Sequence, residues 1–381
     1  MKQTTANRIF LAAGGTGGHF FPALSLARSL QADGFEVVIM TDERARKYGD
    51  QLDGLDIKLT QSATVFAGSR RQRIMAPVRI AFGVLQAMAF YLRSKPKAVI
   101  GFGGYPSFVP LLAARLMLIP IAVHEQNAVL GRANRALVRL GASIAASYVG
   151  TRFIPASKRR RLTLTGNPLR QEVLEVARTP YQPPTPEGVF ELLVFGGSQG
   201  ASVFSEVLPA ALAQLSKEKL QRIRLVQQCR RTDLRVTLKK FHELGIEVEL
   251  RDFFVDLPSR MSKAHVIICR SGASTISELA VMGRPSILVP LPGSLDQDQM
   301  ANAVQLTNHK GAHLIEQRLF TPDRLAGILT ELMETPKLLE DMAARAKKRG
   351  LAEATENLTI FAKNLVTDKA GRGGPAQKGG V

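Results

Sequence analysis

Short apolar runs alternate with segments of helical periodicity along most of the chain. Runs of this length, bounded by glycine or polar residues, are typical of buried strands in a parallel sheet. In the first half we expect strands at 8–13, 36–40, 98–102, 121–124 and 143–147, with helices such as 21–31 and 107–117. In the second half we expect strands at 191–195, 223–228, 247–252, 266–269, 286–290 and 312–316, and helices at 203–215, 235–244, 274–282 and 300–307. The alternation predicts an α/β fold with helices on both faces of parallel sheets.

The two halves of the chain open alike. Each begins with an apolar strand, a glycine-rich loop and a helix: IFLAAGGTGGHFFPALSLA and LLVFGGSQGASVFSEVL. The proline-rich stretch 179–188 between them is expected to be a linker. We therefore predict two Rossmann-like domains, 1–178 and 189–354, with parallel sheets facing a central cleft. A last helix over 355–367 is expected to pack back on the first domain, and the glycine-rich tail 368–381 is expected to be disordered.

The overall composition is that of a folded enzyme. An apolar fraction of 45% and a charged fraction of 22% over 381 residues indicate about two domains and exclude a mainly disordered chain or a small disulfide scaffold. The two cysteines, Cys229 and Cys269, each follow an apolar stretch, so we expect core residues of a reducing compartment. The N-terminus lacks a secretory signal, and no apolar run reaches the ~18–20 residues of a spanning helix. We expect a cytoplasmic chain that does not cross a membrane.

The charge of the chain is strongly one-sided. Lys and Arg number 51 and Asp and Glu 32, which gives a net charge of +19. Between Ile57 and Gln171 stand eighteen basic residues and a single acid, Glu125. Such a field favours an anionic partner: nucleic acid, anionic lipid or a phosphorylated substrate. No helix-turn-helix, zinc module or aromatic sheet signature accompanies it, so a nucleic-acid-binding protein is the disfavoured alternative and no nucleic acid is expected as partner.

Three glycine-rich loops follow predicted strands, at 14–19, 101–107 and 196–200. Glycines in such loops let backbone N–H groups turn toward an anion, and the next helix adds its positive N-terminal end. The first loop lacks the third glycine of the dinucleotide fingerprint, where Phe20 stands, and it also lacks the Gly-Lys-Ser/Thr end of a Walker loop. NAD binding and ATP hydrolysis are therefore disfavoured. In parallel sheets, ligands bind outside the carboxyl ends of the strands, where these loops are expected.

Two titratable residues lie beside these loops. His19 starts a helix directly after the first loop, where it is either a general base or polar substrate contact, or a cap or packed imidazole. Glu125 lies in the polar run HEQN at 124–127, at the end of a strand. It is either a second candidate base or the structural partner of an arginine. The residues alone leave both questions open.

The segment 270–278 (RSGASTISE) follows the strand that ends at Cys269. Thr275 and Glu278 have the spacing of a capping box, which is its structural interpretation. Its functional interpretation places a nucleotide diphosphate on the helix N-terminus, where each anion contact is worth ~0.3–1 kcal/mol. Glu278 would then accept hydrogen bonds from the ribose hydroxyls. A group of carboxylates and amides suited to a sugar follows the next strand: Asp296, Asp298, Gln299 and Asn302.

A series of motifs resembles the bacterial peptidoglycan glycosyltransferases that add N-acetylglucosamine to lipid I to make lipid II. The motifs are GGTGGHxxP at 14–22, GGYPS at 103–107, HEQN followed by Gly131 and Asn134, TGNPLR at 165–170, GGSQGA at 196–201 and CRSGA-x-T-x-x-E at 269–278. The resemblance implies the GT-B fold, UDP-N-acetylglucosamine as donor and undecaprenyl-diphosphate-N-acetylmuramoyl-pentapeptide (lipid I) as acceptor. It places the acceptor and the membrane on the first domain and the UDP-sugar on the second. It also implies a role in cell-wall biogenesis, cell shape and cell division.

The resemblance assigns roles to individual residues. Donor contacts are implied for Thr16, Gly17, Gly18, Asn127, Arg170, Ser198, Val255, Ala273, Ser274, Thr275, Glu278 and Gln299. Acceptor contacts are implied for Tyr105 and Asn134. The family inverts the anomeric centre with no obligatory metal and no cofactor, and His19 and Glu125 remain alternative bases. One departure is Asp298, where the family has His or Gln: an ionised carboxylate accepts but does not donate a hydrogen bond.

The stretch 65–97 is similar to the part of the family that meets the membrane. We expect an exposed patch near its start, made of Arg70, Arg71, Arg73, Ile74, Met75, Arg79 and Phe82. The later helix is expected to turn one face to the core, with Ile80, Val84, Leu85, Met88 and Leu92. The chain is thus expected to be peripheral, on the cytoplasmic face of the inner membrane, where other cell-wall proteins are potential partners. Another GT-B enzyme that uses a UDP-sugar, such as an epimerase or a glycolipid synthase, is the alternative function.

Overall fold

The computed structural model describes residues 7–14, 16–59, 70–197 and 200–367, apart from the side chains at 47, 48, 50, 51 and 70–76. The chain forms two compact units. Unit 1 comprises Met1–Arg170 and Ala352–Val381, and unit 2 comprises Gln171–Leu351. The predicted disordered tail, 368–381, lies outside the described residues.

Unit 1 is built on a seven-stranded parallel sheet in the order β3-β2-β1-β4-β5-β6-β7. Its strands are β1 (Arg8–Ala12), β2 (Glu36–Thr41), β3 (Asp56–Leu59), β4 (Ala98–Gly101), β5 (Ile121–Glu125), β6 (Ser143–Ala146) and β7 (Leu162–Leu164). Its helices are α1 (Gly17–Ala32), η1 (Glu43–Leu52), α2 (Arg70–Ser94), α3 (Tyr105–Leu116), α4 (Arg132–Arg139), η2 (Ala156–Arg161) and α14 (Ala354–Thr367).

The alternation of side chains along each strand supplies unit 1 with two apolar layers. Successive residues of a strand point to opposite faces of the sheet. Phe10 of β1 joins the cluster that contains Tyr91 of α2, whereas its neighbours Ile9 and Leu11 join the cluster that contains Leu358 of α14. Burying a large apolar side chain is worth ~1.5–3 kcal/mol, so both layers stabilise the sheet that carries the loops.

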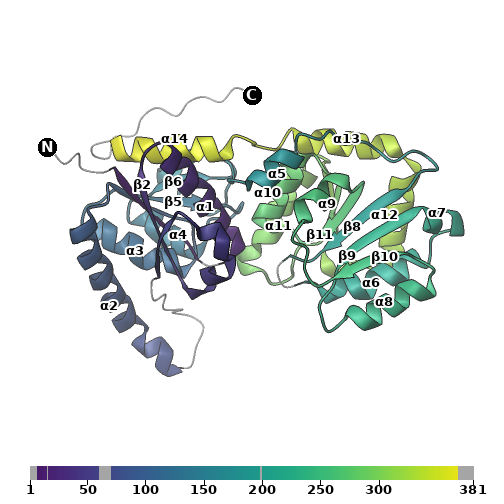
Figure 1. Cartoon of the computed structure of the whole chain (residues 1–381), viewed down its shortest axis with the longest axis horizontal. Coiled ribbons are helices and arrows are strands. Elements are labelled where there is room, and N and C mark those ends of the chain that lie inside the picture. The colour runs from purple at the N-terminus through teal and green to yellow at the C-terminus, as the bar shows by residue number, and fades with distance from the viewer. Residues whose placement is uncertain (1–6, 15, 60–69, 198–199, 368–381) are drawn as a thin grey trace. The chain divides into compact units, whose positions relative to one another are not determined.

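Helix α14 lies beside α1 in unit 1, although the two are far apart in sequence (Figure 1). Its residue Thr359 donates from Oγ1 to Ser29 Oγ over 2.9 Å, and Lys363 pairs with Asp33 over 2.9 Å. The chain therefore leaves unit 1 after Arg170, builds unit 2 and returns to finish the first unit.

Unit 2 repeats the same architecture with a six-stranded parallel sheet in the order β10-β9-β8-β11-β12-β13. Its strands are β8 (Phe190–Phe195), β9 (Ile223–Gln228), β10 (Val248–Arg251), β11 (Val266–Cys269), β12 (Ser286–Leu288) and β13 (Ala312–Leu314). Its helices are α5 (Gln171–Val176), α6 (Ser202–Leu212), α7 (Lys217–Arg222), α8 (Leu234–Glu243), α9 (Leu257–Lys263), α10 (Ala273–Met282), η3 (Leu295–Gln297), α11 (Asp298–Thr307), η4 (Gln317–Leu319), α12 (Pro322–Glu334) and α13 (Pro336–Lys347). The predicted class, two α/β units with parallel sheets, is confirmed.

The segment 179–188, predicted as a linker, is packed into unit 2, and this unit starts earlier, at Gln171. Tyr181 packs against the core and donates from its hydroxyl to the His265 carbonyl over 3.1 Å. Arg222 donates to the carbonyls of Thr185 and Gly188 over 3.2 and 2.9 Å. Prolines lack the N–H that a strand needs for pairing, so this stretch does not form a strand, and Arg222 binds two of its carbonyls.

The strand orders place the loops. In each sheet the order reverses beside the first strand of the unit, so β1 and β4 flank the switch point of unit 1, and β8 and β11 that of unit 2. Ligands of open parallel sheets bind outside the carboxyl ends of the strands at such points. The three glycine loops and the segment that starts at Arg270 all follow these four strands.

Cys229 and Cys269 are buried free thiols of unit 2, as predicted. Within the part of the chain that the structure describes, none of the helices combines the length and the apolarity needed to cross a membrane.

Candidate functional site

His19 links the first two glycine loops of unit 1. Its Nδ1 lies 3.1 Å from Thr16 Oγ1, one turn back at the start of α1. The imidazole also lies over the bare backbone of Gly103 and Gly104, which have positive φ angles of 90° and 72°. A Cβ on Gly103 would stand 3.3 Å from His19 Nε2 and 3.6 Å from Asn134 Nδ2, so glycine here admits both side chains.

The surroundings of His19 favour its neutral form. Burial, and next the positive charge of Arg44, lower the pKa of His19 to about 4. At neutral pH the imidazole therefore carries no charge and is able to accept a proton. The interpretation as a general base is compatible with this geometry.

Arg44 is a neighbour that the sequence did not single out. It follows β2 and donates to both carboxylate oxygens of the buried Asp42, over 3.0 and 2.6 Å. Its Nη2 is 3.8 Å from the place where a side chain of Gly14 would begin. In the sequence, the signal that could have pointed to Arg44 was the polar run TDER at the end of an apolar strand. In the structure, that strand is β2, which lies beside β1.

His124 is a structural histidine. It is fully buried in β5, its Nε2 lies 2.9 Å from the Gly166 carbonyl and its Nδ1 lies 2.9 Å from Gln126 Nε2. The carbonyl requires a proton on Nε2 and the amide requires a lone pair on Nδ1, which defines one neutral tautomer. Burial lowers the pKa of His124 to about 4, in agreement with that form.

Glu125 is enclosed by N–H donors. Oε1 accepts from the backbone and the side-chain nitrogen of Asn127, over 3.1 and 3.3 Å. Oε2 accepts from Gly131 N over 2.8 Å and from Asn134 Nδ2 over 2.9 Å. Burial raises the pKa of Glu125, and these four donors act in the opposite direction. In place of the arginine that one of the two interpretations suggested, amide groups bind this carboxylate, and it braces the loop that carries Asn127 and Asn134.

The remaining predicted site residues of unit 1 lie on loops that follow the carboxyl ends of its strands. Thr16 and Gly18 are exposed and Gly17 is half-buried. Tyr105 is the first residue of α3 and half-buried. Arg170 lies with its guanidinium carbon 5.2 Å from the ring centre of Phe21 in α1.

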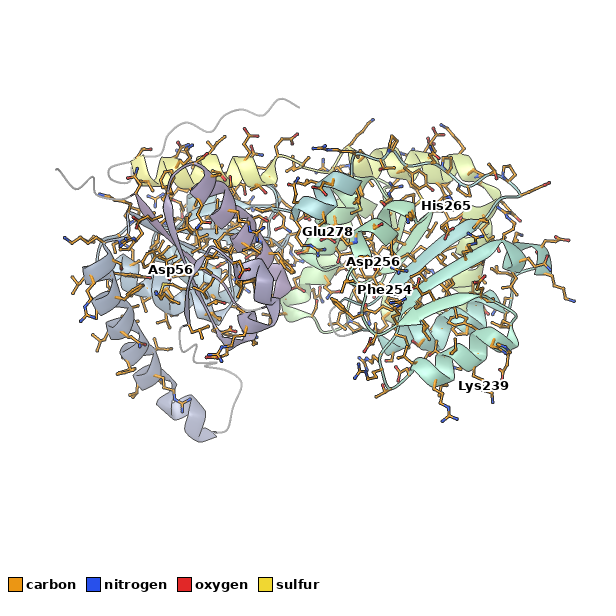
Figure 2. The ribbon with its side chains drawn as sticks, in the orientation of Figure 1. Asp56, Lys239, Phe254, Asp256, His265 and Glu278 are labelled. Carbon is orange, nitrogen blue, oxygen red and sulfur yellow. The ribbon has the colours of Figure 1, made fainter. Side chains whose placement is uncertain are left out.

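In unit 2, the first turn of α10 holds Ala273, Ser274 and Thr275 together. The helix begins after Gly272, and no side chain caps it. Thr275 therefore lies inside the helix, and the capping-box interpretation is wrong. Uncapped N–H groups at a helix start are available to an anion. Glu278 lies one turn further along this helix (Figure 2). It is buried, with 7% of its surface exposed.

The loop after β12 is held by Arg270 and Gln299. Arg270 donates from Nη1 to the carbonyls of Val289 and Pro290, over 3.0 and 3.2 Å, so it braces this strand end. Gln299 accepts from Leu291 N at Oε1 over 3.0 Å. Two successive non-glycine residues of this loop, Asp296 and Gln297, have positive φ angles of 55° and 56°. Backbone strain of this kind, ~1–3 kcal/mol per residue, is concentrated at ligand sites in proteins.

The third glycine loop joins β8 to α6. A Cβ on Gly196 would stand 2.4 Å from Ala201 N, so this turn requires glycine. Gly196 N donates to Gln228 Oε1 over 3.2 Å, which ties the loop to the end of β9. Ser198, the predicted donor contact, lies outside the described residues.

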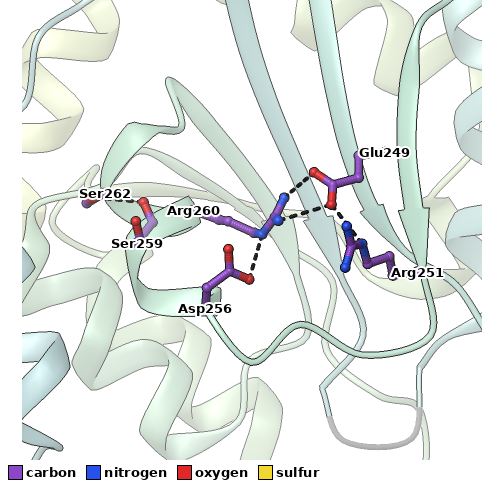
Figure 3. A network of polar contacts seen from close by, with 6 residues as sticks. All are labelled: Glu249, Arg251, Asp256, Ser259, Arg260 and Ser262. Carbon is purple, nitrogen blue, oxygen red and sulfur yellow. Dashed lines mark hydrogen bonds and ion pairs between the residues drawn. The ribbon is translucent and has the colours of Figure 1, made fainter.

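Val255 lies in the loop after β10 and is 85% exposed. A network of ion pairs fixes this loop (Figure 3). Arg260 donates to both oxygens of Glu249 over 2.5 and 3.0 Å and to Asp256 over 2.8 Å, and its guanidinium lies 4.4 Å from the ring centre of Phe254. An exposed apolar side chain on a fixed loop is suited to contact with the flat ring of a nucleotide base.

Helix α2 turns an apolar and basic face outward. Phe82 is 65% exposed, and Val78 and Arg79 are exposed. The core face agrees with the prediction in part. Val84 is buried and Ile80 and Met88 pack against the core, whereas Leu85 and Leu92 are exposed, at 64% and 68%. Ala87 and Tyr91 are buried on the same face. The helical period of 3.6 residues places 80, 84, 87, 88 and 91 on one face of the helix and turns 85 and 92 away from it. The side chains of Arg70, Arg71, Arg73, Ile74 and Met75 lie outside the described residues.

Among the described residues, no three His, Cys, Asp or Glu side chains gather as the ligands of a metal ion would.

Comparisons with known proteins match both units. Residues 9–146 match the glycosyltransferase family 28 N-terminal domain, and residues 191–358 match the C-terminal domain of the same family. Curated relatives from Methylorubrum extorquens (strain PA1) and Sinorhizobium fredii (strain NBRC 101917 / NGR234) are 46% and 44% identical, over 93% and 94% of this chain and 96% and 95% of their own. Both are named UDP-N-acetylglucosamine–N-acetylmuramyl-(pentapeptide) pyrophosphoryl-undecaprenol N-acetylglucosamine transferase. The crystal structure of Acinetobacter baumannii MurG matches with a TM-score of 0.76 and 32% identity, covering 94% of this chain and 99% of that one.

Proposed function

The chain belongs to glycosyltransferase family 28, and we infer that it transfers N-acetylglucosamine from UDP-N-acetylglucosamine to undecaprenyl-diphosphate-N-acetylmuramoyl-pentapeptide, which makes lipid II for peptidoglycan synthesis. The observation that carries this conclusion is the 46% and 44% identity to transferases of that name across 93% and 94% of the chain. The matched family domains, residues 9–146 and 191–358, lie one in each unit and include the three glycine loops and the start of α10.

The reaction needs a base and a site for the departing nucleotide. A hydroxyl oxygen of the acceptor attacks C1 of N-acetylglucosamine, the bond from C1 to the β-phosphate oxygen breaks, and UDP leaves with that electron pair. The acceptor proton passes to the base. We assign this role to His19, whose neutral imidazole lies between the two glycine loops, and we assign Glu125 to bracing because four N–H groups already occupy its oxygens.

The donor is assigned mainly to unit 2. The uncapped start of α10, with Ala273, Ser274 and Thr275, supports binding of the diphosphate and stabilises the charge of departing UDP. Glu278 is assigned to the ribose hydroxyls, Val255 to the base and Gln299 to the sugar. The other donor contacts carried over from the family are Thr16, Gly17, Gly18, Asn127, Arg170 and Ser198.

The proposed reaction requires no metal ion and no cofactor. Helix N–H groups and arginines supply the positive charge that a divalent cation supplies elsewhere. Transfer activity that persists in excess EDTA would support this part of the proposal, and restoration of activity only by added Mg²⁺ or Mn²⁺ would contradict it.

The acceptor carries a polyprenyl chain, so we propose that unit 1 attaches peripherally to the inner membrane at its cytoplasmic face. The exposed Val78, Arg79, Phe82 and Leu85 of α2 support this. Basic residues at an anionic surface contribute ~1 kcal/mol each, and exposed apolar side chains add shallow insertion. Other proteins of cell-wall synthesis are potential partners at that surface.

A transfer assay tests the proposed function. Purified protein is given radiolabelled UDP-N-acetylglucosamine, UDP-glucose or UDP-N-acetylgalactosamine, with a short-chain lipid I analogue or diacylglycerol as acceptor. We expect product only from UDP-N-acetylglucosamine with the lipid I analogue. Transfer to diacylglycerol would indicate a glycolipid synthase, and conversion of the UDP-sugar without acceptor would indicate an epimerase.

A further inference from the structure

An exposed aromatic ring with two arginines beside it lies in unit 1, and the reaction above does not use it. Phe153 follows β6 and is 46% exposed. The guanidinium carbon of Arg135 in α4 lies 4.6 Å from the centre of this ring, and that of Arg152 lies 5.3 Å from it. Both distances are within the range of cation–π contacts, so one ring holds two positive charges close together.

The backbone at Phe153 is strained. Its φ angle is +64°, in the left-handed region that bulky residues rarely adopt. Its two neighbours are fixed, because Arg152 pairs with Val129 in a β-bridge and Ile154 is buried in the core. Glycine would adopt this conformation more readily. Strained residues of this kind are concentrated at binding and active sites, where the fixed geometry is used.

The two positive charges lie in a basic part of the chain. Glu125 is the only acid between residues 57 and 171, and four N–H groups already bind its oxygens. Arg152 forms no ion pair with any residue that the structure describes. Two guanidiniums beside one ring repel each other, and an anion bound to both offsets that repulsion. The planar fork of each guanidinium matches the oxygens of a carboxylate or a phosphate.

This pair of arginines lies close to the proposed catalytic residues. Arg152 N donates to the Ala128 carbonyl over 2.9 Å, in the segment that joins β5 to α4. Arg135 directly follows Asn134, whose amide nitrogen packs at the same glycine as His19. The peptide of the acceptor is attached to the sugar that reacts at the base, so its residues lie within a short distance of this edge of unit 1.

We propose that Arg135 and Arg152 bind a carboxylate of the acceptor's pentapeptide and that Phe153 positions the two guanidiniums. The inference rests on the proposed function, in which the acceptor carries that peptide. A peptide joined to the sugar through its amino end has a free carboxylate at its other end, which the guanidinium fork matches. Membrane phosphates are the other source of anionic oxygen, but the proposed membrane residues are on α2, and α3 lies between α2 and α4 (Figure 1).

Steady-state kinetics of the full-length protein with two acceptors test the arginines. Both acceptors are short-chain lipid I analogues, one with the free carboxylates of its pentapeptide and one with these carboxylates amidated. R135Q combined with R152Q should raise KM for the free form about tenfold, as expected for lost hydrogen bonds between charged groups. KM for the amidated form and for UDP-N-acetylglucosamine should stay unchanged. R152Q alone, at an exposed side chain, should change KM in the same direction by less, and R152K by less again, because lysine keeps the charge but not the fork.

R159Q combined with R160Q is the matched control, because Arg159 and Arg160 are exposed residues of η2 in the same unit. It removes the same two charges and should leave every KM unchanged. Equal losses in the two double variants would reduce the effect to net charge and overturn the proposal. Equal rises in KM for the free and the amidated acceptor would also overturn it, and so would no change for either. Weaker binding to anionic vesicles with both of these KM values unchanged would assign the pair to the membrane instead.

F153G tests the positioning role of Phe153. Its thermal midpoint should stay the same or rise, because glycine adopts the positive φ without strain, whereas KM for the free acceptor should rise severalfold. F153Y keeps the ring and should behave as the wild-type protein does. A lower midpoint with unchanged KM in F153G would make the ring purely structural and exclude positioning by it. If the wild-type protein failed to transfer sugar, the proposed function would be wrong, but calorimetric binding of muramoyl-pentapeptide, free and amidated, would still decide whether the arginines bind the carboxylate.

Discussion

Asn134 donates a hydrogen bond from Nδ2 to Oε2 of Glu125 over 2.9 Å, inside a set of four N–H groups that face that carboxylate. The same amide nitrogen lies 3.6 Å from where a Cβ of Gly103 would stand, and His19 Nε2 lies 3.3 Å from that same point. His19, the proposed base, thus packs at the same glycine as Asn134, and Asn134 is one of the four donors that hold the Glu125 carboxylate.

Glu125→Gln should therefore act mainly on stability. The new amide group would face N–H donors, so the free energy of unfolding should fall by about 1–3 kcal/mol. Turnover should decrease, but the pH at which the rate falls on the acid side should stay the same as in the wild-type protein. The control is Asp33→Asn, which breaks an exposed pair with Lys363 and should cost at most about 1 kcal/mol. Normal stability with abolished turnover would instead make Glu125 the base.

The acid limb of kcat/KM should lie near pH 4. The pKa of His19 is lowered to about 4, so its imidazole stays neutral and basic as the pH falls from neutral to about 5, and protonation removes the base only below that. Initial rates with the short-chain acceptor across this range measure the limb. A limb centred near the ordinary histidine pKa of about 6.5 would show that His19 is not the base, or that it is solvated in the working enzyme.

Acid should destabilise unit 1 through His124. Its folded pKa is about 4 against an unfolded value of about 6.5, so between these values the unfolded chain binds a proton that the folded chain does not. The free energy of unfolding should therefore decrease as the pH falls through this window, by roughly 1.4 kcal/mol per pH unit for one proton. Urea titrations at several pH values measure how steeply the free energy of unfolding changes with pH. In His124→Gln this slope should be smaller than in wild type by roughly 1.4 kcal/mol per pH unit. The exposed His309→Gln is the control, and an equal slope in His124→Gln and wild type would contradict the assignment.

Glu278→Gln should weaken UDP binding. If the carboxylate accepts from the ribose hydroxyls, replacing it by an amide should raise the calorimetric Kd for UDP about tenfold or more. Glu334→Gln, which breaks a surface pair with Lys219, is the matched control. Unchanged UDP affinity would remove Glu278 from the donor site.

Exposed residues of α2 should govern vesicle binding. Arg79→Ser together with Phe82→Ser should weaken binding to anionic vesicles and lower the activity on lipid-embedded acceptor, but not on the short-chain analogue. The wider set Arg70, Arg71, Arg73 and Arg79 to Ser should release the protein. The control is Val236→Ser with Leu238→Ser, an exposed apolar pair on α8 of unit 2. Equal losses on both acceptors would make α2 part of the catalytic site.

The strands and glycine loops were predictable because short apolar runs end where parallel strands end, and glycine marks turns that a Cβ would block, as at Gly196. Three features were not predictable. Leu85 and Leu92 of α2 were expected in the core together with Val84 because all three are equally apolar in sequence, and only packing leaves the two leucines exposed. The helix start at Gly272 lies three residues before the expected cap at Thr275. The pair of Asp42 and Arg44 looks like any surface ion pair until the sheet order sets β2 beside β1.

The late return of α14 to unit 1 sets an order for synthesis on the ribosome. Leu358 and Ala362 complete a core layer that also holds Ile9 and Leu11, residues made at the other end of the chain. Unit 2 is a continuous segment and emerges whole before α14 does. The nascent chain can thus close its second unit while the first still lacks part of its core, and a premature stop near residue 350 would leave that first unit with an uncovered apolar face for proteases and chaperones to recognise.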